Sequence, residues 1–261
     1  MNSLKQLFTP NQVLSKRAAV TLTAAQLVLF LVVWVLADCK MFPTPVQILA
    51  SFDDLLLKKG MLFHLWVSAK TVFKAMGLSI LISLVLAYAS TLPAFRFLGF
   101  VGSKLRFVPL AGLAFLFTVL FGGEHIKMSL LTYGITVFFL TGMLSVVLDT
   151  KKSELDHARL LGMSEWRTTL EVIVLGKFDQ VLEIARQNFA IAWTMLTFVE
   201  GVSRSEGGVG VLLNNSDKHF NLPEMFAMLI CIFVVGLAID YLLGLIRRVA
   251  FPYTVMSLER S

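Results

Sequence analysis

Residues 128–148 read MSLLTYGITVFFLTGMLSVVL and contain no charged side chain over 21 positions. A helix of about 20 apolar residues is long enough to cross the hydrocarbon core of a bilayer. Because backbone groups in lipid must be hydrogen-bonded within their own segment, we expect this stretch to form a membrane-spanning α-helix. The uncharged run at 18–37, AAVTLTAAQLVLFLVVWVLA, predicts another span by the same argument.

Further apolar runs continue this pattern along the chain. The run at 187–199 is short and is bounded by Arg186 and Glu200, so a helix there must extend through one or both charges to cross. The hydrophobic fraction of the 261 residues is 57% and the charged fraction only 15%, which excludes an ordinary soluble enzyme. The runs do not alternate between apolar and polar residues, which excludes an outer-membrane barrel. We predict an all-α polytopic membrane protein with about six transmembrane helices, at 18–37, 75–92, 107–123, 128–148, 187–199 and 225–246.

The positions of the basic residues predict the orientation of these spans. If the N-terminus is cytoplasmic, the inner segments contain 14 Lys and Arg residues and the outer segments contain 6. Lys and Arg accumulate on the cytoplasmic side of membrane proteins, so both termini are predicted to be cytoplasmic. This gives an N-terminal segment 1–17, a transmembrane domain 18–250 that includes a cytoplasmic loop at 149–180, and a tail 251–261.

The cytoplasmic loop is the longest polar stretch on its side, DTKKSELDHARLLGMSEWRTTLEVIVLGKFDQ. Apolar residues recur at near-helical spacing on both sides of Gly162, which predicts a short helix, a turn at the glycine and a second helix. Ser164 is a candidate N-cap for the second helix. The periodicity alone is equally typical of an amphipathic hairpin that lies on the bilayer surface.

The spacing inside this loop resembles the EAA loop of ABC importer permeases. Asp156-His157-Ala158 stands where that motif has Glu-Ala-Ala, Gly162 follows after three residues, and Ile173-Val174-Leu175 stands where the motif has Ile, one residue and Leu-Pro. The form of the loop is similar to that of the nitrate, sulfonate and taurine permease group. The resemblance continues at MFPTPVQILASF (41–52), AIAWTML (190–196), Glu200, GGVGVLL (207–213) and Asp240 with Arg247-Arg248.

This resemblance implies a type I ABC importer permease in the bacterial cytoplasmic membrane. In that family the loop docks on a cytoplasmic ATPase subunit, and the permease works as a homodimer with two ATPase subunits and a substrate-binding protein. The chain has no GxxxxGK[ST] motif, so ATP would be bound by the partner and no cofactor or enzyme activity is expected here. The solute would be small and anionic. The implied ATPase-coupling residues are Asp156, His157, Ala158, Arg159, Leu161, Gly162, Met163, Ser164 and Glu165.

The fifth span carries the candidate translocation path. Trp193, Thr194 and Thr197 form a polar-aromatic stripe at helical spacing, and Glu200 ends the span near the outer face. Ionisable groups within the membrane are costly and often functional. The alternatives are that Trp193 is a packing residue and that Glu200 is an interfacial residue.

The sequence also predicts the surroundings of two further charged residues and the start of the third span. Arg186 is expected to reach lipid phosphates, and Asp240 to pair with Arg247 or Arg248. Pro109 is expected near the start of the third span, where a helix N-terminus that lines a pore would favour an anion.

Some patterns argue against other classes of protein. The histidines show no metal-ligand spacing, the two cysteines give no disulfide framework, and no partner of nucleic-acid type is indicated. A glycine-rich outer loop is expected to be flexible and to meet a binding protein. A secondary carrier and an intramembrane enzyme are the competing classes; the latter would need clustered catalytic groups within the spans. The histidines are His64, His125, His157 and His219, and the cysteines are Cys39 and Cys231. The glycine-rich outer loop contains Ser203, Ser205, Gly207, Gly208 and Gly210.

Overall fold

The computed structural model describes residues 15–36, 42–122, 125–203 and 207–252, and its regular elements within these ranges are all helical. This confirms the all-α prediction. Short 3-10 turns lie at Pro93–Phe95 and Leu105–Phe107, and π-helical turns at Asp54–Lys58 and Thr169–Leu175. The α-helices are α2 (Lys16–Leu36), α3 (Pro45–Asp53), α4 (Met61–Ala89), α5 (Arg96–Lys104), α6 (Leu110–Phe121), α7 (Ile126–Leu148), α8 (Lys152–Leu160), α9 (Glu165–Thr168), α10 (Phe178–Val202), α11 (Val209–Lys218) and α12 (Leu222–Ala250).

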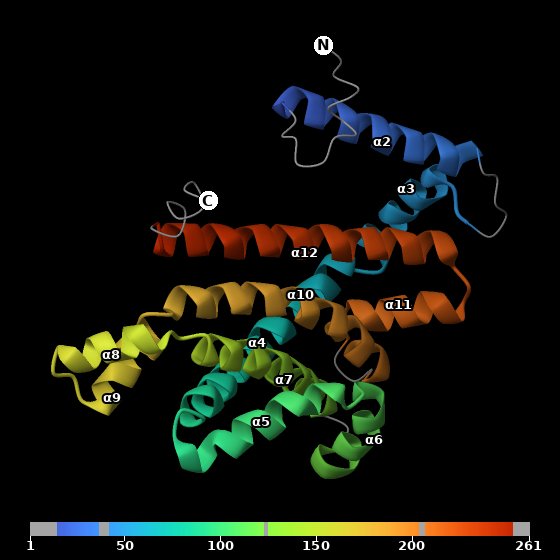
Figure 1. The fold of residues 1–261 in the computed structure, drawn as a ribbon. Helices are drawn as coiled ribbons and strands as arrows, with labels where there is room; N and C mark the ends of the chain where they lie inside the picture. The colour runs from blue at the N-terminus through green and yellow to red at the C-terminus, as the bar shows by residue number, and fades with distance from the viewer. Residues whose placement is uncertain (1–14, 37–41, 123–124, 204–206, 253–261) are drawn as a thin grey trace.

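Helix α7 lies at the centre of the bundle, where it packs against α4, α5, α6 and α10 (Figure 1). Its buried face includes Ile135 and Phe139, which belong to the main apolar core. Two hydroxyls of α4 bind its backbone, because Ser79 donates to the carbonyl of Thr132 at 2.9 Å and Ser83 to that of Thr136 at 3.0 Å. Interhelical bonds of this kind hold membrane helices together where no hydrophobic driving force separates protein from lipid.

Among the described residues, four helices are both long and apolar enough to cross a membrane, namely α2, α4, α7 and α12. Helix α10 has 25 residues and is long enough, but its first half carries Asp179, Glu183 and Arg186. It contains the whole predicted run 187–199 and extends through the charges at both ends of it, as the sequence required. The number of spans therefore stays a prediction.

The third predicted span, 107–123, is not one straight helix. Helix α6 has 12 residues, which gives a length of about 18 Å. It follows the segment Pro93–Phe107 with a bend of 112°, and the two pieces reach the length of a span only together. Pro109 causes the break, since proline lacks an amide donor and pushes Val108 into extended backbone, with φ −80° and ψ 120°.

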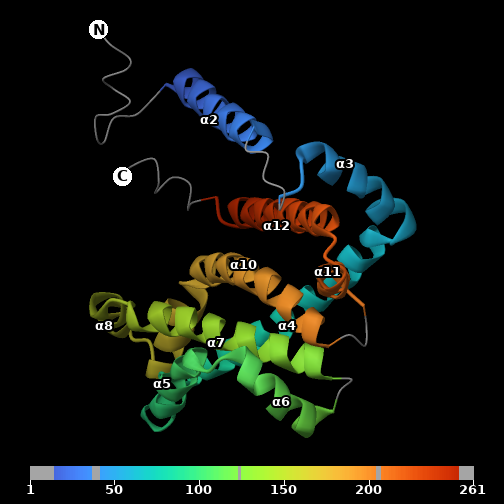
Figure 2. The same ribbon diagram turned by 90° about the vertical axis from the view of Figure 1, so that its right-hand side faces the viewer.

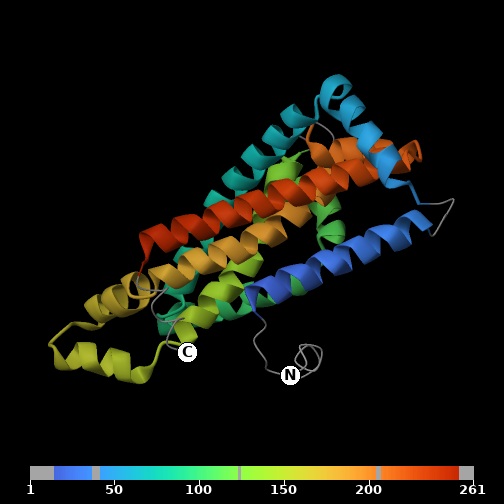
Figure 3. The same cartoon turned by 90° about the horizontal axis from the view of Figure 1, so that it is seen from above.

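The two ends of the bundle differ in their elements. Helices α8 and α9 protrude at one end, which also contains the start of α2 and the end of α12, while α3 and α11 lie at the other (Figures 1 and 3). We call these the hairpin end and the glycine-loop end, after residues 207–210 near the start of α11. Most of 1–17 and 251–261 lies outside the described residues, and the orientation of the spans stays a prediction.

Candidate functional site

The predicted helix-turn-helix at 149–180 is present as the α8–α9 hairpin. Gly162 has a φ of +78°, a left-handed conformation that glycine adopts without strain. Its amide donates to the carbonyl of Arg159 at 2.9 Å, and the amide of Met163 donates to that of Ala158 at 3.2 Å, so the last carbonyls of α8 are satisfied. Ser164 is the N-cap of α9, as predicted, and accepts from the amide of Arg167.

Arg159 fixes the angle of this hairpin. Its guanidinium donates to Asp156 Oδ1 at 2.8 Å within α8 and to both carboxylate oxygens of Glu165 on α9, at 2.8 and 3.0 Å. The hydrogen bonds from Arg159 lower the pKa of the Glu165 carboxyl below its ordinary value. These pairs are open to solvent, so they set geometry rather than adding much stability.

The tip of the hairpin presents large apolar side chains to solvent. Leu160, Leu161 and Trp166 are 85%, 65% and 72% exposed, while Ala158 is buried against the hairpin and Met163 is half-buried. His157 also faces outward. An exposed apolar cluster with a polar rim is typical of a protein-protein contact.

The hairpin is tied to the bundle through α10. Glu154 of α8 forms an ion pair of 2.9 Å with Lys177, the residue that precedes α10. The π-helical turn Thr169–Leu175 leads from α9 back toward the same point. A displacement of the hairpin therefore acts directly on the start of α10.

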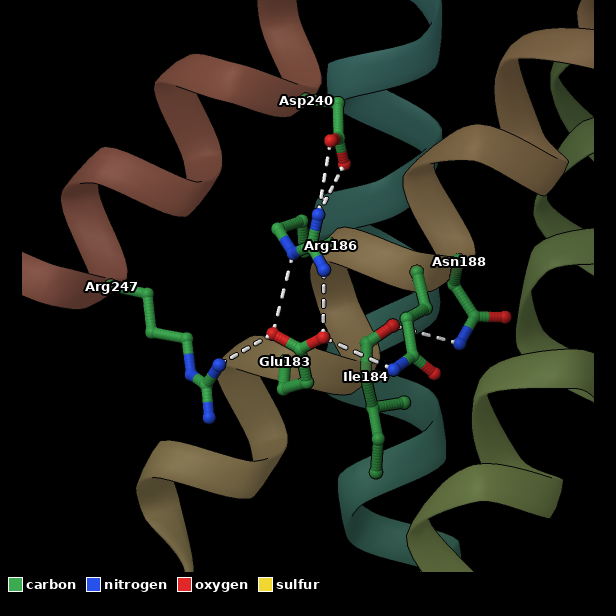
Figure 4. Close-up of polar contacts among 7 residues, drawn as sticks. Glu183, Ile184, Arg186, Asn188, Asp240 and Arg247 are labelled. Carbon is green, nitrogen blue, oxygen red and sulfur yellow. Dashed lines mark hydrogen bonds and ion pairs between the residues drawn. The ribbon is translucent and has the colours of Figure 1, made fainter. Parts of the chain in front are cut away.

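Helix α10 is in turn joined to α12 by the charged network of Figure 4. Arg186 donates to both oxygens of Asp240, at 2.9 and 3.0 Å, and to Glu183 at 2.8 Å. Arg247 donates to the other oxygen of Glu183 at 2.8 Å. Both sequence predictions here were wrong: Arg186 does not reach outward to lipid phosphates, and Asp240 pairs with Arg186 rather than with Arg247 or its neighbour. Arg186 binds a carboxylate on its own helix and another on α12, while Arg247 of α12 reaches across to Glu183 of α10.

The predicted path residues lie in different surroundings. Trp193 is buried between α10 and α12, where its indole donates to the carbonyl of Ile232 at 2.9 Å and its ring stacks on Phe189. Thr194 is exposed and Thr197 is half-buried, and each hydroxyl binds a carbonyl of its own helix. Their role in translocation stays a prediction.

Glu200 is enclosed at the glycine-loop end, with none of its surface exposed. It forms an ion pair of 3.0 Å with Lys127 of α7, whose side chain is also buried. The hydroxyl of Ser68 lies 2.8 Å from both carboxylate oxygens, and the amide of Gly210 donates at 2.9 Å. Lys127 is one of the six basic residues that the predicted orientation assigns to the outer segments. It directly precedes the uncharged run 128–148, and this position was the signal in the sequence for a charge at the membrane.

The glycine loop folds onto this ion pair. Gly208 has a φ of +124°, and a Cβ atom there would lie 2.2 Å from the Glu200 carboxylate. Its amide donates to His64 Nδ1 at 3.1 Å, and Lys127 donates to the carbonyl of Gly207 at 3.1 Å. The expectation of a flexible loop was therefore wrong for 207–210, because the loop backbone pairs with buried side chains. Ser205 lies outside the described residues.

No family model matches the chain, but comparisons with known proteins find related permeases and solved structures of similar fold. The chain is similar to the putative aliphatic sulfonates transport permease protein SsuC of Bacillus subtilis, with 26% identity over 216 residues that cover 79% of this chain and 75% of that protein. A probable ABC transporter permease of Brucella melitensis is 27% identical over 131 residues, or 45% of this chain and 53% of the relative.

The fold matches a crystal structure described as an amino acid ABC transporter with histidines. The TM-score is 0.62 at 17% identity, and the match covers 76% of this chain and 97% of that one. At this identity the likeness concerns the fold alone. Together with the relatives it confirms the resemblance to binding-protein-dependent ABC permeases and the multi-pass membrane architecture.

Proposed function

We propose that this chain is the permease subunit of an ATP-driven importer, and that it provides the path for a small solute with an oxyanion group, of the nitrate, sulfonate or taurine kind. The observation that carries the proposal is the α8–α9 hairpin, with its exposed Leu160, Leu161 and Trp166 beside the tight turn at Gly162. A surface of this shape and composition suits a groove on a separate ATPase subunit. The relative named as a permease for aliphatic sulfonates supports the class of solute.

Coupling would proceed through the contacts that join the hairpin to the spans. When two ATPase subunits close on ATP, the hairpin moves with them, and the Glu154–Lys177 pair passes the movement to α10. The Arg186–Asp240 pair then carries α12 along with α10. The ATPase shifts the equilibrium only by the difference in its affinity for the two states of the permease.

The proposed assembly places partners on both sides of the bilayer. Two copies of this chain form the path, two ATPase subunits bind at the hairpin end in the cytoplasm, and a substrate-binding protein docks at the glycine-loop end. The membrane is the bacterial cytoplasmic membrane. ATP is bound and hydrolysed by the ATPase subunits, so we assign no catalytic residue or cofactor to this chain.

The substitution Gly162→Asp tests the proposal. A Cβ atom at Gly162 meets nothing within 4 Å in this chain, so any clash must come from a partner. Gly60→Asp is the matched control, since Gly60 also has a left-handed φ, +61°, and open space around it, but lies outside the hairpin. The full chain is co-expressed with candidate ABC ATPase subunits, and both ATPase capture and solute uptake are measured.

We expect Gly162→Asp to abolish capture or to uncouple hydrolysis from uptake, while Gly60→Asp retains both. Equal uptake by both variants would contradict the proposal. Uptake that continues without any ATPase would instead identify a secondary carrier.

A further inference from the structure

The break between α5 and α6 lies inside the bent segment Pro93–Phe121, whose two pieces reach the length of a span only together. Tyr133 of α7 donates its hydroxyl to the carbonyl of Leu105 at 3.0 Å, and the Leu110 side chain packs against Gly134. Gly134 is about 12 Å from the first residue of α7 and about 21 Å from the last, at about 1.5 Å per residue. Irregular backbone at membrane depth is tolerated only where protein or a water-filled cavity surrounds it.

Arg106 stands at this break without an acidic partner. Its guanidinium lies over the ring of Phe107, 5.0 Å from the centroid, and no carboxylate within the described parts of the chain is in ion-pair distance of it. Arg186 of α10 and Lys127 of α7, by contrast, each have a carboxylate at 2.9 or 3.0 Å. An unpaired cation in a span is costly, and such residues mark ion pathways.

A small cavity adjoins the Arg106 side chain. Its volume is about 200 Å³, which is below the usual range for drug-sized ligands and suits a solute of few heavy atoms. No acidic side chain lines it, and Met195 brings α10 to its wall next to the predicted path residue Thr194. The lining residues are Leu105, Arg106, Val108, Pro109, Leu110, Tyr133, Gly134, Val137, Phe138 and Met195.

We propose that Arg106 binds the oxyanion head of the transported solute at this break, an inference that rests on the proposed transport function. A guanidinium presents paired donors that match two oxygens of a sulfonate or nitrate group. The lining offers no carboxylate for an ammonium group, so the site favours simple anions over zwitterions such as taurine. A single cation in an otherwise apolar wall binds weakly enough to release the solute, as conduction requires.

Binding of ethanesulfonate tests the site directly. The full chain in lipid nanodiscs is titrated calorimetrically with ethanesulfonate, with taurine as the zwitterionic competitor. Arg106→Gln should weaken binding at least about tenfold, which corresponds to about 1.4 kcal/mol for one charge-assisted interaction. Lys104→Gln is the matched control, because Lys104 also lies over a phenylalanine ring but does not line the cavity.

A charge-selective thiol reaction provides a second measurement. Val108→Cys is introduced together with Cys39→Ser and Cys231→Ser, and its reaction rates are compared for a sulfonate-bearing and a trimethylammonium-bearing methanethiosulfonate. Adding Arg106→Gln should lower the ratio of anionic to cationic rate by about tenfold, whereas Arg106→Lys should preserve it, since the charge remains.

The outcomes separate this site from the proposed function. If Lys104→Gln lowered the rate ratio or the binding of ethanesulfonate as much as Arg106→Gln does, the inference would be overturned. The effects of the two variants would then reflect the positive charge of the whole region and not a site at Arg106. No binding by the unsubstituted chain, or competition by taurine as strong as by ethanesulfonate, would also overturn it. If the binding and thiol-reaction results agree with the inference but the hairpin captures no ATPase, the anion site at Arg106 is supported and the coupling proposal fails.

Discussion

Arg159 at the hairpin end and Lys127 at the glycine-loop end both pair with carboxylates, yet their surroundings are opposite. The side chain of Arg159 is 42% exposed and that of Lys127 only 1%. Arg159 bridges two short helices that touch the bundle at one point. Lys127 joins α7, α10 and the glycine loop, and a Cβ atom at Gly208 would lie 2.2 Å from the Glu200 carboxylate with which Lys127 pairs.

This difference indicates that ion pairs have two structural roles in this chain. The exposed pairs of Arg159 add little stability, but they orient the two helices of the hairpin and leave its apolar surface open to a partner. A buried pair contributes little net stability but is expensive to break, so it holds three segments in one arrangement. The predictions below separate these two roles, and the tests of Gly162 and Arg106 above add a functional readout to each end.

The largest effect is expected from Lys127→Met. It leaves Glu200 buried without its cation and should lower the free energy of unfolding by about 3–5 kcal/mol. The double variant Lys127→Met with Glu200→Gln removes both charges but keeps an acceptor for Ser68 and Gly210, so it should recover much of the loss. Thermal unfolding of the purified variants measures both. A double variant as unstable as the single one would show that the charge pair is not the cause.

A smaller loss is expected from Gly208→Ala. The methyl group would lie 2.2 Å from the Glu200 carboxylate, on a backbone with φ +124°, so both a clash and strain oppose it. Strain of this kind costs about 1–3 kcal/mol. Gly60→Ala is the control, because its φ is +61° but nothing lies within 4 Å, and it should cost only about 1–2 kcal/mol. Equal unfolding temperatures for the two variants would contradict the fit of the loop over Glu200.

The smallest effect is expected at the hairpin, from pH. Arg159 lowers the pKa of Glu165 below its ordinary 4.5, so the pair stabilises the fold above that pH and its contribution is lost as the pH falls through the lowered value. The difference in unfolding temperature between the unsubstituted chain and Arg159→Gln should therefore be small at pH 7 and should shrink as the pH falls through the lowered pKa of Glu165. A difference that grows on acidification would reverse the sign of the argument.

Features that depend on neighbouring residues were predicted well from the sequence, and contacts between residues far apart in the chain were not. The run 128–148 predicted α7 almost to its ends, and Gly162 with Ser164 predicted the hairpin turn and its cap, because these signals lie within a few residues. The partners of Glu200 and Asp240 come from helices far along the chain, and no local pattern specifies them. Pro109 was noticed, but apolar continuity across 107–123 hid the bend, because hydropathy does not register the extended backbone that proline imposes on Val108.

Helix α2 has a consequence for the order of assembly. None of its apolar window is buried in the chain, and it lies along one side of the bundle, apart from α4 and α7 (Figures 2 and 3). It can therefore enter the bilayer as an independent span before α4 and the helices that follow it have been synthesised, and only the contact of Trp34 with the core has to form later. The remaining helices then condense around α7 while already tethered to the membrane. This spares the broken α5–α6 segment and its cations from having to anchor the chain.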